Sequence, residues 1–280
     1  MNYSKYFKGW NTKNHFDKFN PWSNYSNSFF NFTFGSFYEN KIIIDILTKN
    51  KNFTVLDVGC ASGYLLRFIK KNVLNFNLDN YYGVDLSKSA IDFAKNKYGK
   101  NNFELLDNEN LDIKKNNSYN VVYSRDTILH QMQPIQFIEK LISLSTNYVV
   151  VRLRTRDKGK TEYSCDNSCQ MHYDKYWMPY IVINSNELLE LFKKNSFVKK
   201  MFINKSHMVL GGQNYRFLPK ELFFSETGGA ETTIILELDK SKENKGKLQV
   251  IETLEKEGQN YISENRFKFL IYRILNKLKI

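Results

Sequence analysis

Small residues and one acid are spaced along a short segment in a way that could hold a ligand. They are Asp57, Gly59, Cys60, Ala61 and Gly63. An apolar stretch precedes them and a helical pattern follows, so the segment is expected to join a strand to a helix. Glycine lets a backbone approach a ligand closely, and the first N–H groups of a helix are free to bind it. The segment therefore predicts a binding turn.

The charge at this turn indicates which ligand fits. Dinucleotide-binding turns carry G-x-G-x-x-G around a pyrophosphate. Here Asp57 leads the turn, and it would repel a pyrophosphate but suit an ammonium group. Asp85 ends the next apolar stretch, where a carboxylate can accept hydrogen bonds from both hydroxyls of a ribose. The pair predicts a nucleoside cofactor with a cationic amino-acid group and argues against a dinucleotide reductase.

With these motifs, residues 50–155 resemble the class I S-adenosylmethionine-dependent methyltransferases. By this resemblance Asp57 and Gly59 lie beside the methionine moiety, Asp85 holds the ribose, and Asp107 reaches the adenine. Ala61 replaces the second glycine of the usual motif, and Asn120 stands where the family usually has an acid. The expected cofactor contacts are Asp57, Gly59, Cys60, Ala61, Gly63, Asp85, Leu86, Asp107, Asn108 and Ser124.

Residues 120–132 look like the motif of that family that passes near the transferred methyl group. A hydroxyl acceptor must lose a proton, so a base within hydrogen-bond reach helps. His130 is the first candidate, because histidine titrates near neutrality, and Asp126 is the second. The alternatives are a structural histidine at a helix start and, for Asp126, a cap or an ion pair with Arg125.

Three arginines alternate along the expected strand 148–153 and just beyond it, at Arg152, Arg154 and Arg156. A period of two places them on one face, and arginine binds phosphate or carboxylate with a bidentate fork. They predict an anionic acceptor; the alternative is a solvated edge with Asp157 and Glu162 as partners. The expected acceptor-binding residues are Arg125, Arg152, Arg154, His172, Tyr173 and Trp177.

Two cysteines and a histidine, Cys165, Cys169 and His172, have a spacing that invites a metal. Zinc would need a fourth ligand, from Asp174 or His207. The alternative, which we favour, is a substrate loop without metal. Residues 179–184 and 213–219 also resemble, more weakly, a methyltransferase group associated with bacterial surface-polysaccharide biosynthesis, which implies a saccharide or saccharide-attached acceptor. The expected reaction is O-methylation of a small anionic or saccharide-type acceptor, with N-methylation as the alternative.

Strand-like and helix-like segments alternate around these motifs and predict an α/β fold with a parallel sheet. The methyltransferase resemblance implies a Rossmann-like sheet of seven strands, mostly parallel, with the last strand antiparallel and helices on both faces. We expect an irregular stretch over 157–184, a helix capped by Ser185, and helices over 248–280. The expected regions are 1–50 (aromatic lid and helix), 51–156 (cofactor core), 157–240 (acceptor excursions and further strands) and 241–280 (linker and C-terminal helix).

Composition limits the partners. The 280 residues are 42% hydrophobic and 15% aromatic, which excludes a wholly disordered chain. Three cysteines and no apolar leader favour a cytoplasmic protein. The net charge of +12 leaves an RNA methyltransferase as a rival, but the motifs of base-methylating enzymes are absent, so nucleic acid is disfavoured. A catalytically silent cofactor-binding subunit that needs a partner is a second rival.

The C-terminal residues 266–280 carry five basic residues and no acid. Their apolar residues share one face of a helical wheel, which predicts an amphipathic helix. Such a helix can lie on an anionic membrane surface at the inner face of the membrane, pack on its own domain, or form a homodimer. The sequence leaves these alternatives open.

Overall fold

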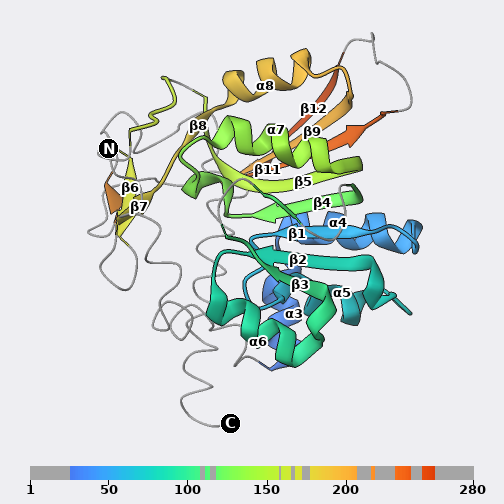
Figure 1. Ribbon diagram of the computed structural model, residues 1–280. Helices are drawn as coiled ribbons and strands as arrows, with labels where there is room; N and C mark the ends of the chain where they lie inside the picture. Colours follow the sequence, from blue (N-terminus) through green and yellow to red (C-terminus); the bar gives the residue numbers. More distant parts are fainter. Residues whose placement is uncertain are drawn as a thin grey trace.

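The computed structural model describes residues 26–107, 111–113, 118–157, 159–164, 168–171, 177–206, 216–217, 231–240 and 248–255. Within this part, nine strands form one sheet, shown in Figure 1. They are β1 (Val55–Val58), β2 (Tyr81–Asp85), β3 (Phe103–Leu105), β4 (Tyr119–Arg125), β5 (Ser145–Arg156), β8 (Ile183–Asn184), β9 (Val198–Ser206), β11 (Glu231–Leu238) and β12 (Gln249–Glu255). Their order is β12-β9-β11-β5-β4-β1-β2-β3, with β8 beside β5.

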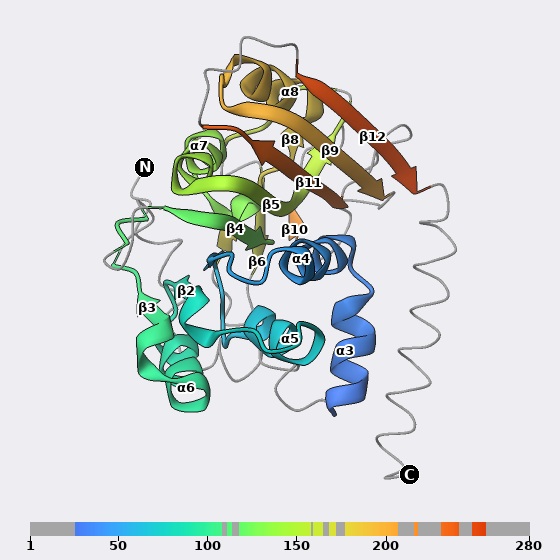
Figure 2. The same ribbon diagram turned by 90° about the vertical axis from the view of Figure 1, so that its right-hand side faces the viewer.

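Helices cover both faces of the sheet, as Figure 2 shows for α7 and α4 on opposite sides of β5. The helices are α3 (Asn27–Gly35), α4 (Tyr38–Lys49), α5 (Tyr64–Asn72), α6 (Lys88–Tyr98), α7 (Pro134–Leu144) and α8 (Ser185–Lys194), with short 3₁₀ turns η3 (Leu78–Asn80), η4 (Lys100–Asn102) and η5 (Ile128–His130). One core contains residues of α7 and α8, and the other contains residues of α3, α4, α5 and α6. The sheet therefore lies between two helical layers.

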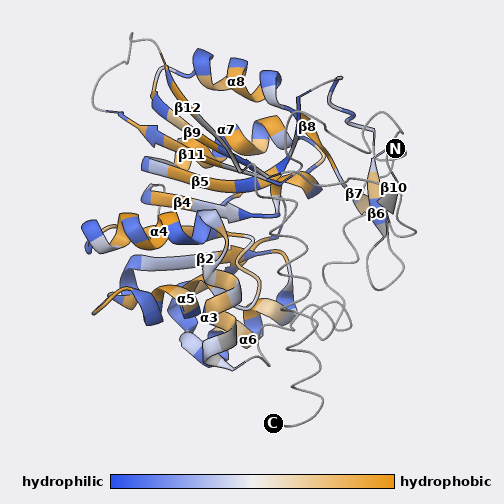
Figure 3. Ribbon diagram, turned by 180° about the vertical axis from the view of Figure 1, so that it is seen from behind, coloured by the Kyte–Doolittle hydropathy of each residue, from blue (hydrophilic) through white to orange (hydrophobic). Residues whose placement is uncertain are grey.

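Local sequence explains these elements. All four residues of β1 are buried, because a central parallel strand is covered on both faces. Ser87 begins α6 by accepting a hydrogen bond from the Ala90 N–H, and Pro134 stands in the first turn of α7. Helices α4 and α8 alternate hydrophilic and hydrophobic turns in Figure 3, as expected for helices with one buried side.

The predicted α/β architecture is confirmed, with two differences in the strands. β11 is antiparallel to both β5 and β9, as expected of the last strand of seven. β8 and β12 are additional, so the described sheet has nine strands rather than seven. The prediction of helix from residue 248 is wrong for β12, which pairs in parallel with β9. Val250 and Ile251 are β-branched and suit a strand at a sheet edge.

The stretch 157–184 is more regular than expected. It contains β6 (Cys169–Met171), β7 (Trp177–Pro179) and β8, and β6 also pairs with β10 (Arg216–Phe217). Two separate parts of the expected acceptor region 157–240 therefore meet in one small antiparallel sheet. The expected region 1–50, an aromatic lid and one helix, contains two helices, α3 and α4, within its described part.

The cap of α8 also differs from the prediction. The side chain of Asn184, rather than Ser185, accepts the hydrogen bond from the Asn186 N–H. Ser185 Oγ instead donates to Asp157 Oδ1 over 2.7 Å. Asparagine and serine both cap helices well, so the sequence alone does not show which of these two neighbouring residues is the cap.

Several predicted features fall outside the described residues: Asn108, Cys165, His172, Tyr173 and the segment 266–280. Among the described segments, no helix is long and apolar enough to cross a bilayer. In the same segments, no group of three His, Cys, Asp or Glu side chains is placed to hold a metal ion.

Candidate active site

The turn between β1 and α5 is built from positive-φ residues. Gly59, Ala61 and Gly63 have φ angles of 79°, 47° and 80°. A Cβ on Gly59 would overlap the Thr127 hydroxyl, so this position requires glycine for both its space and its backbone angle. The Gly59 and Cys60 N–H groups donate to the Val84 carbonyl over 2.9 and 3.1 Å, which fixes the turn against β2.

Asp85, at the end of β2, holds the same turn through its side chain. Oδ2 accepts from the Ala61 N–H and Oδ1 from the Ser87 N–H, each over 2.8 Å. Burial raises the pKa of this carboxyl, and the backbone hydrogen bonds oppose the rise. A carboxylate has about four lone-pair directions. The lone pairs that the backbone N–H groups of Ala61, Leu86 and Ser87 leave can accept ligand hydroxyls.

Asp57 lies inside the protein, 2% exposed, beside the turn. The Tyr81 hydroxyl donates to its Oδ2 over 2.6 Å. Burial raises the pKa of the Asp57 carboxyl to about 7; the Tyr81 hydrogen bond opposes the rise and the charge of Asp85 adds to it. No cation within the described residues forms an ion pair with Asp57. A buried carboxyl of this kind gains from a nearby ammonium group.

The remaining cofactor candidates differ in what their side chains do. Cys60 is buried beneath the turn and burial raises the pKa of its thiol. Ser124 is fully buried, and its hydroxyl donates to the Val58 carbonyl over 3.0 Å, so it joins β4 to β1. Leu86 packs partly buried against the core, and Asp107 is exposed after β3. Of these four, Asp107 alone presents an exposed polar side chain.

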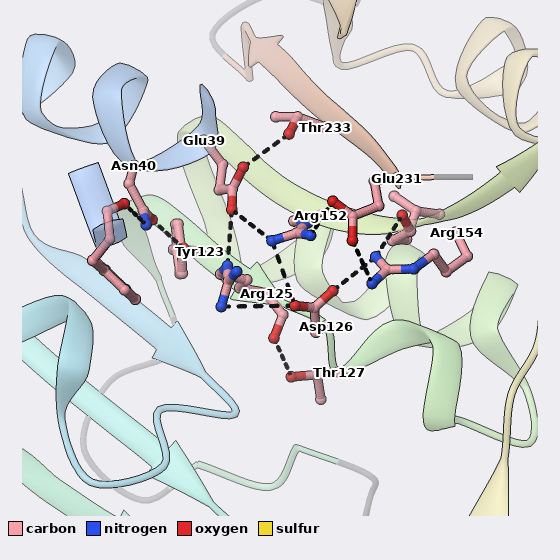
Figure 4. A network of polar contacts seen from close by, with 12 residues as sticks. Glu39, Asn40, Tyr123, Arg125, Asp126, Thr127, Arg152, Arg154, Glu231 and Thr233 are labelled. Carbon is pink, nitrogen blue, oxygen red and sulfur yellow. Dashed lines mark hydrogen bonds and ion pairs between the residues drawn. The ribbon is translucent and has the colours of Figure 1, made fainter. Parts of the chain in front are cut away.

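The arginines expected to bind the acceptor lie in a network of ion pairs, shown in Figure 4. It contains three cations and three carboxylates: Arg125, Arg152, Arg154, Glu39, Asp126 and Glu231. Arg125 Nε lies 2.9 Å from Glu39, Arg152 pairs with Glu231, and Arg154 Nη1 lies 2.9 Å from Asp126. The formal charges cancel. The expected alternative partners, Asp157 and Glu162, are not among these contacts; Asp157 pairs with Lys205 instead.

Helix α4, which packs on the strands, contributes Glu39 to this network. Glu39 is 2% exposed, and its second oxygen accepts from the Thr233 hydroxyl over 3.0 Å. The Phe37 ring lies under two guanidinium groups, 4.2 Å from Arg125 and 4.8 Å from Arg152. Such cation–π contacts add to the ion pairs where water is excluded. The network therefore fixes α4 against β4, β5 and β11.

Arg156 was expected on the same face as the other two arginines, but its guanidinium makes a different contact. Arg156 Nη1 donates to the Lys160 carbonyl over 3.5 Å. Asn184, opposite Arg156 in the β5–β8 pairing, donates to the Gly159 carbonyl over 2.5 Å. Arg156 thus belongs to the connection between β5 and β8 rather than to the network.

Asp126 follows β4 in a left-handed conformation, with φ of 56°. Burial opposes its ionisation, but the charges of Arg152, Arg154 and Arg125 hold the pKa of its carboxyl well below the usual range. A carboxylate with so low a pKa is a weak base. The Asp126 carboxylate is therefore better suited to accept hydrogen bonds from a ligand than to abstract a proton from it.

His130 ends the η5 turn beyond β4 and is 9% exposed. Its Nδ1 lies 2.7 Å from the Pro179 carbonyl, an acceptor, so Nδ1 carries the proton. In the neutral ring the basic nitrogen is then Nε2. Pro179 ends β7, and the Ile181 N–H donates to the Leu129 carbonyl over 2.7 Å. The small sheet is thereby fixed beside His130.

The carboxyl ends of parallel strands bring these residues to one edge of the sheet. β1 and β2 supply the turn and Asp85, β4 supplies Asp126, and β5 supplies Arg152. Trp177 is placed in β7 by its backbone. Sequence reasoning missed Glu39, Glu231 and Tyr81. Glu39 stands in a helix where an exposed acid is the usual case, so no local signal marked it.

Comparison with known proteins places residues 49–196, more than half of the chain, in a family described as a methyltransferase domain. A curated relative is a putative methyltransferase, 235L, of Invertebrate iridescent virus 6, 32% identical over 90 residues. The match spans 31% of this chain and 31% of the length of that relative.

Solved structures with similarity to this chain include two that also carry methyltransferase descriptions. One is magnesium protoporphyrin IX methyltransferase from Synechocystis PCC 6803 with bound SAM, at 15% identity and a TM-score of 0.39, covering 72% of this chain and 80% of that one. The other is a SAM-dependent methyltransferase from Aquifex aeolicus, at 19% identity and a TM-score of 0.40, covering 72% and 89%.

Proposed function

Because the chain belongs to the methyltransferase-domain family, with the Rossmann-like class I fold, we propose that it transfers a methyl group from S-adenosylmethionine to a hydroxyl oxygen of a small acceptor. The turn after β1 and the carboxylate of Asp85 carry this proposal. Together they offer close backbone approach and hydroxyl binding at the carboxyl edge of the sheet, where such folds bind ligands.

The residues present fit the cofactor. Gly59 gives the turn the positive φ and the close packing against Thr127 that it requires, and Asp85 retains lone pairs for ribose hydroxyls. Asp57 offers a buried carboxyl for an ammonium group, and Asp107 lies exposed at the end of β3 for the adenine. When bound, S-adenosylmethionine supplies a methyl group on a positively charged sulfur.

The protein's own part in the reaction is to position the acceptor and remove its proton. His130 Nε2 is proposed to accept the proton of the acceptor hydroxyl, because Nδ1 already donates its own hydrogen to the Pro179 carbonyl. Asp126 stays ionised and favours the protonated imidazole, since the two groups attract each other. The small sheet of β6, β7 and β10 is proposed as part of a lid that excludes water from this edge.

For the acceptor we propose a small saccharide-type molecule, in a cytoplasmic step of surface-polysaccharide biosynthesis. The resemblance of residues 179–184 to enzymes of that pathway supports it, and the same segment contacts His130 and Leu129. An anionic acceptor, the other form of this hypothesis, has less support, because the carboxylates beside Arg152 and Arg154 cancel their charge.

Calorimetric titration of the purified protein with S-adenosylmethionine, S-adenosylhomocysteine and NADH tests the proposal. We expect micromolar binding of both sulfur compounds, at least tenfold weaker binding in Asp85→Ala, and no binding of NADH. Asp79→Ala is the matched control, because Asp79 is exposed and precedes the opposite end of β2. NADH binding, or sulfur-compound affinity equal in Asp85→Ala and the wild type, would contradict the assignment.

A further inference from the structure

One hydrogen-bond donor in the ion-pair network lacks an acceptor. Arg152 Nη1 is buried and makes no hydrogen bond. Its two nearest carboxylate oxygens, Glu39 Oε1 and Asp126 Oδ2, lie 3.6 and 3.7 Å away. Charge-assisted N–H···O bonds are about 2.7–2.9 Å long. A buried donor left unpaired is costly, so the gap indicates a place for an oxygen atom.

The matching acceptor is also incomplete. Asp126 Oδ1 accepts from Arg154 over 2.9 Å, whereas Oδ2 accepts no hydrogen bond from any residue in the described ranges. The Asp126 side chain is 31% exposed and Arg152 only 6%, so a ligand reaches this gap along Asp126. The gap thus has one N–H donor and one carboxylate acceptor.

The surrounding charges select the ligand. An anion entering here would meet the carboxylates of Asp126, Glu39 and Glu231, and an ammonium group would meet the three arginines. An uncharged hydroxyl group accepts from Arg152 and donates to Asp126 at no cost in net charge. Such a group satisfies both atoms without adding charge.

Resting on the proposed function, we propose that Arg152 Nη1 and Asp126 Oδ2 form a subsite for a second, unmethylated hydroxyl of an uncharged polyhydroxyl acceptor. Asp126 lies four residues before His130, and the two side chains interact electrostatically. Because Asp126 and His130 both follow β4, the bound hydroxyl lies at the same edge of the sheet as the proposed base. The subsite selects a neutral diol over its phosphorylated, carboxylated or amino counterpart.

The test uses a panel of methyl hexopyranosides and methyl 6-deoxyhexopyranosides, each with its phosphate, uronate, amino and single-deoxy counterparts where these exist. Transfer of labelled methyl from S-adenosylmethionine is measured for each. We expect kcat/KM at least tenfold higher for an uncharged diol than for its charged counterparts. Loss of the neighbouring hydroxyl in one deoxy analogue should raise KM about tenfold.

Arg152→Lys keeps the positive charge but removes the Nη1 donor. It should raise KM for the diol about tenfold, leave KM for the matching deoxy analogue unchanged, and leave S-adenosylhomocysteine affinity unchanged. Lys205→Arg is the matched control, because it makes the reverse substitution, lysine to arginine. It does so at a buried cation of β9 that pairs with Asp157 and lies outside the network. It should change neither KM. Asp126→Asn takes the place of Arg152→Lys if that variant does not fold.

Three results would overturn the subsite: better transfer to charged members, an unchanged diol KM in the variant that is tested, or no transfer to any diol although S-adenosylhomocysteine binds. The second would mean that Nη1 serves structure alone. Failure to bind S-adenosylhomocysteine in the wild type would instead reject the proposed function, so the two failures are distinguishable.

Discussion

Asp57 is a buried acid whose protonation depends on folding, and this gives a prediction at the residue scale. Its carboxyl has an ordinary pKa of 3.8 and a folded pKa of about 7. The folded protein therefore binds the proton more tightly, and stability falls as pH rises from about 4 to 7. Asp57→Asn does not titrate, so its stability relative to wild type should rise over this window, by on the order of 4 kcal/mol at most.

Urea unfolding of both proteins at pH 5, 6, 7 and 8 measures this difference. Tyr81→Phe should move the window to higher pH, because the Tyr81 hydrogen bond lowers the pKa of Asp57. A difference between Asp57→Asn and wild type that stays constant with pH would show that Asp57 does not change protonation in this range.

His130 gives the second prediction at this scale. His130→Gln keeps an N–H donor for the Pro179 carbonyl but removes the basic nitrogen. We expect kcat to fall about 10²–10⁴-fold with cofactor affinity unchanged. The pH profile of the residual activity should lose the acidic limb of the wild type. An unaltered kcat with a normal profile would assign His130 to structure.

The places of motif residues in the fold could be predicted from the sequence, and their hydrogen-bond partners could not. Asp57 lies in β1 and Asp85 ends β2, both next to glycine and apolar patterns, and His130 follows β4 in the η5 turn. Tyr81 is an ordinary strand residue in sequence, and its hydroxyl reaches Asp57 only because β1 and β2 pair in register. Pairing across a sheet is a tertiary property that local pattern does not encode.

At the scale of elements, the turn after β1 depends on the absence of a side chain. Gly59→Ala would combine a strained φ of 79° with overlap at Thr127, so we expect loss of cofactor binding and of about 1–3 kcal/mol of stability. Gly99→Ala is the control, because Gly99 also has positive φ but its nearest neighbour leaves 3.5 Å for a Cβ. It should lose stability and retain binding, as calorimetry and urea unfolding can show.

Elements with a strong period were predictable, and edge elements were not. The buried strands β1 and β2 coincide with the apolar stretches that lead into the glycine turn and end at Asp85. β12 was predicted as helix because its seven residues alternate too briefly to distinguish strand from helix. Its pairing with β9 determines the outcome.

At the scale of the whole molecule, Glu39 joins segments from opposite parts of the chain. It contacts Arg125, Arg152 and Thr233, the last 194 residues away. Glu39→Gln leaves the buried arginines with excess charge, and such a loss costs about 3–5 kcal/mol. We expect a matching fall in the free energy of unfolding.

The control on the same helix is Asp45→Asn, which breaks an exposed pair with Lys49 and should cost about 0–1 kcal/mol. In a double-mutant cycle, Arg125→Met should cost less in the Glu39→Gln background than alone. Additive effects would mean that the two charges do not interact across the molecule. The sequence predicted neither the contacts of Glu39 with Arg125 and Thr233 nor their contribution to stability, because no motif connects α4 to β11.

Strand β12 also determines on which side the chain leaves the sheet. Glu255 pairs with Ser206, Ser206 with Glu231, and Glu231 with Arg154. A chain leaving after the antiparallel β11 would depart from the opposite edge. One added parallel strand therefore reverses this direction, and a protein fused directly after Glu255 would be tethered at the same end of the strands as Arg154 and the candidate site.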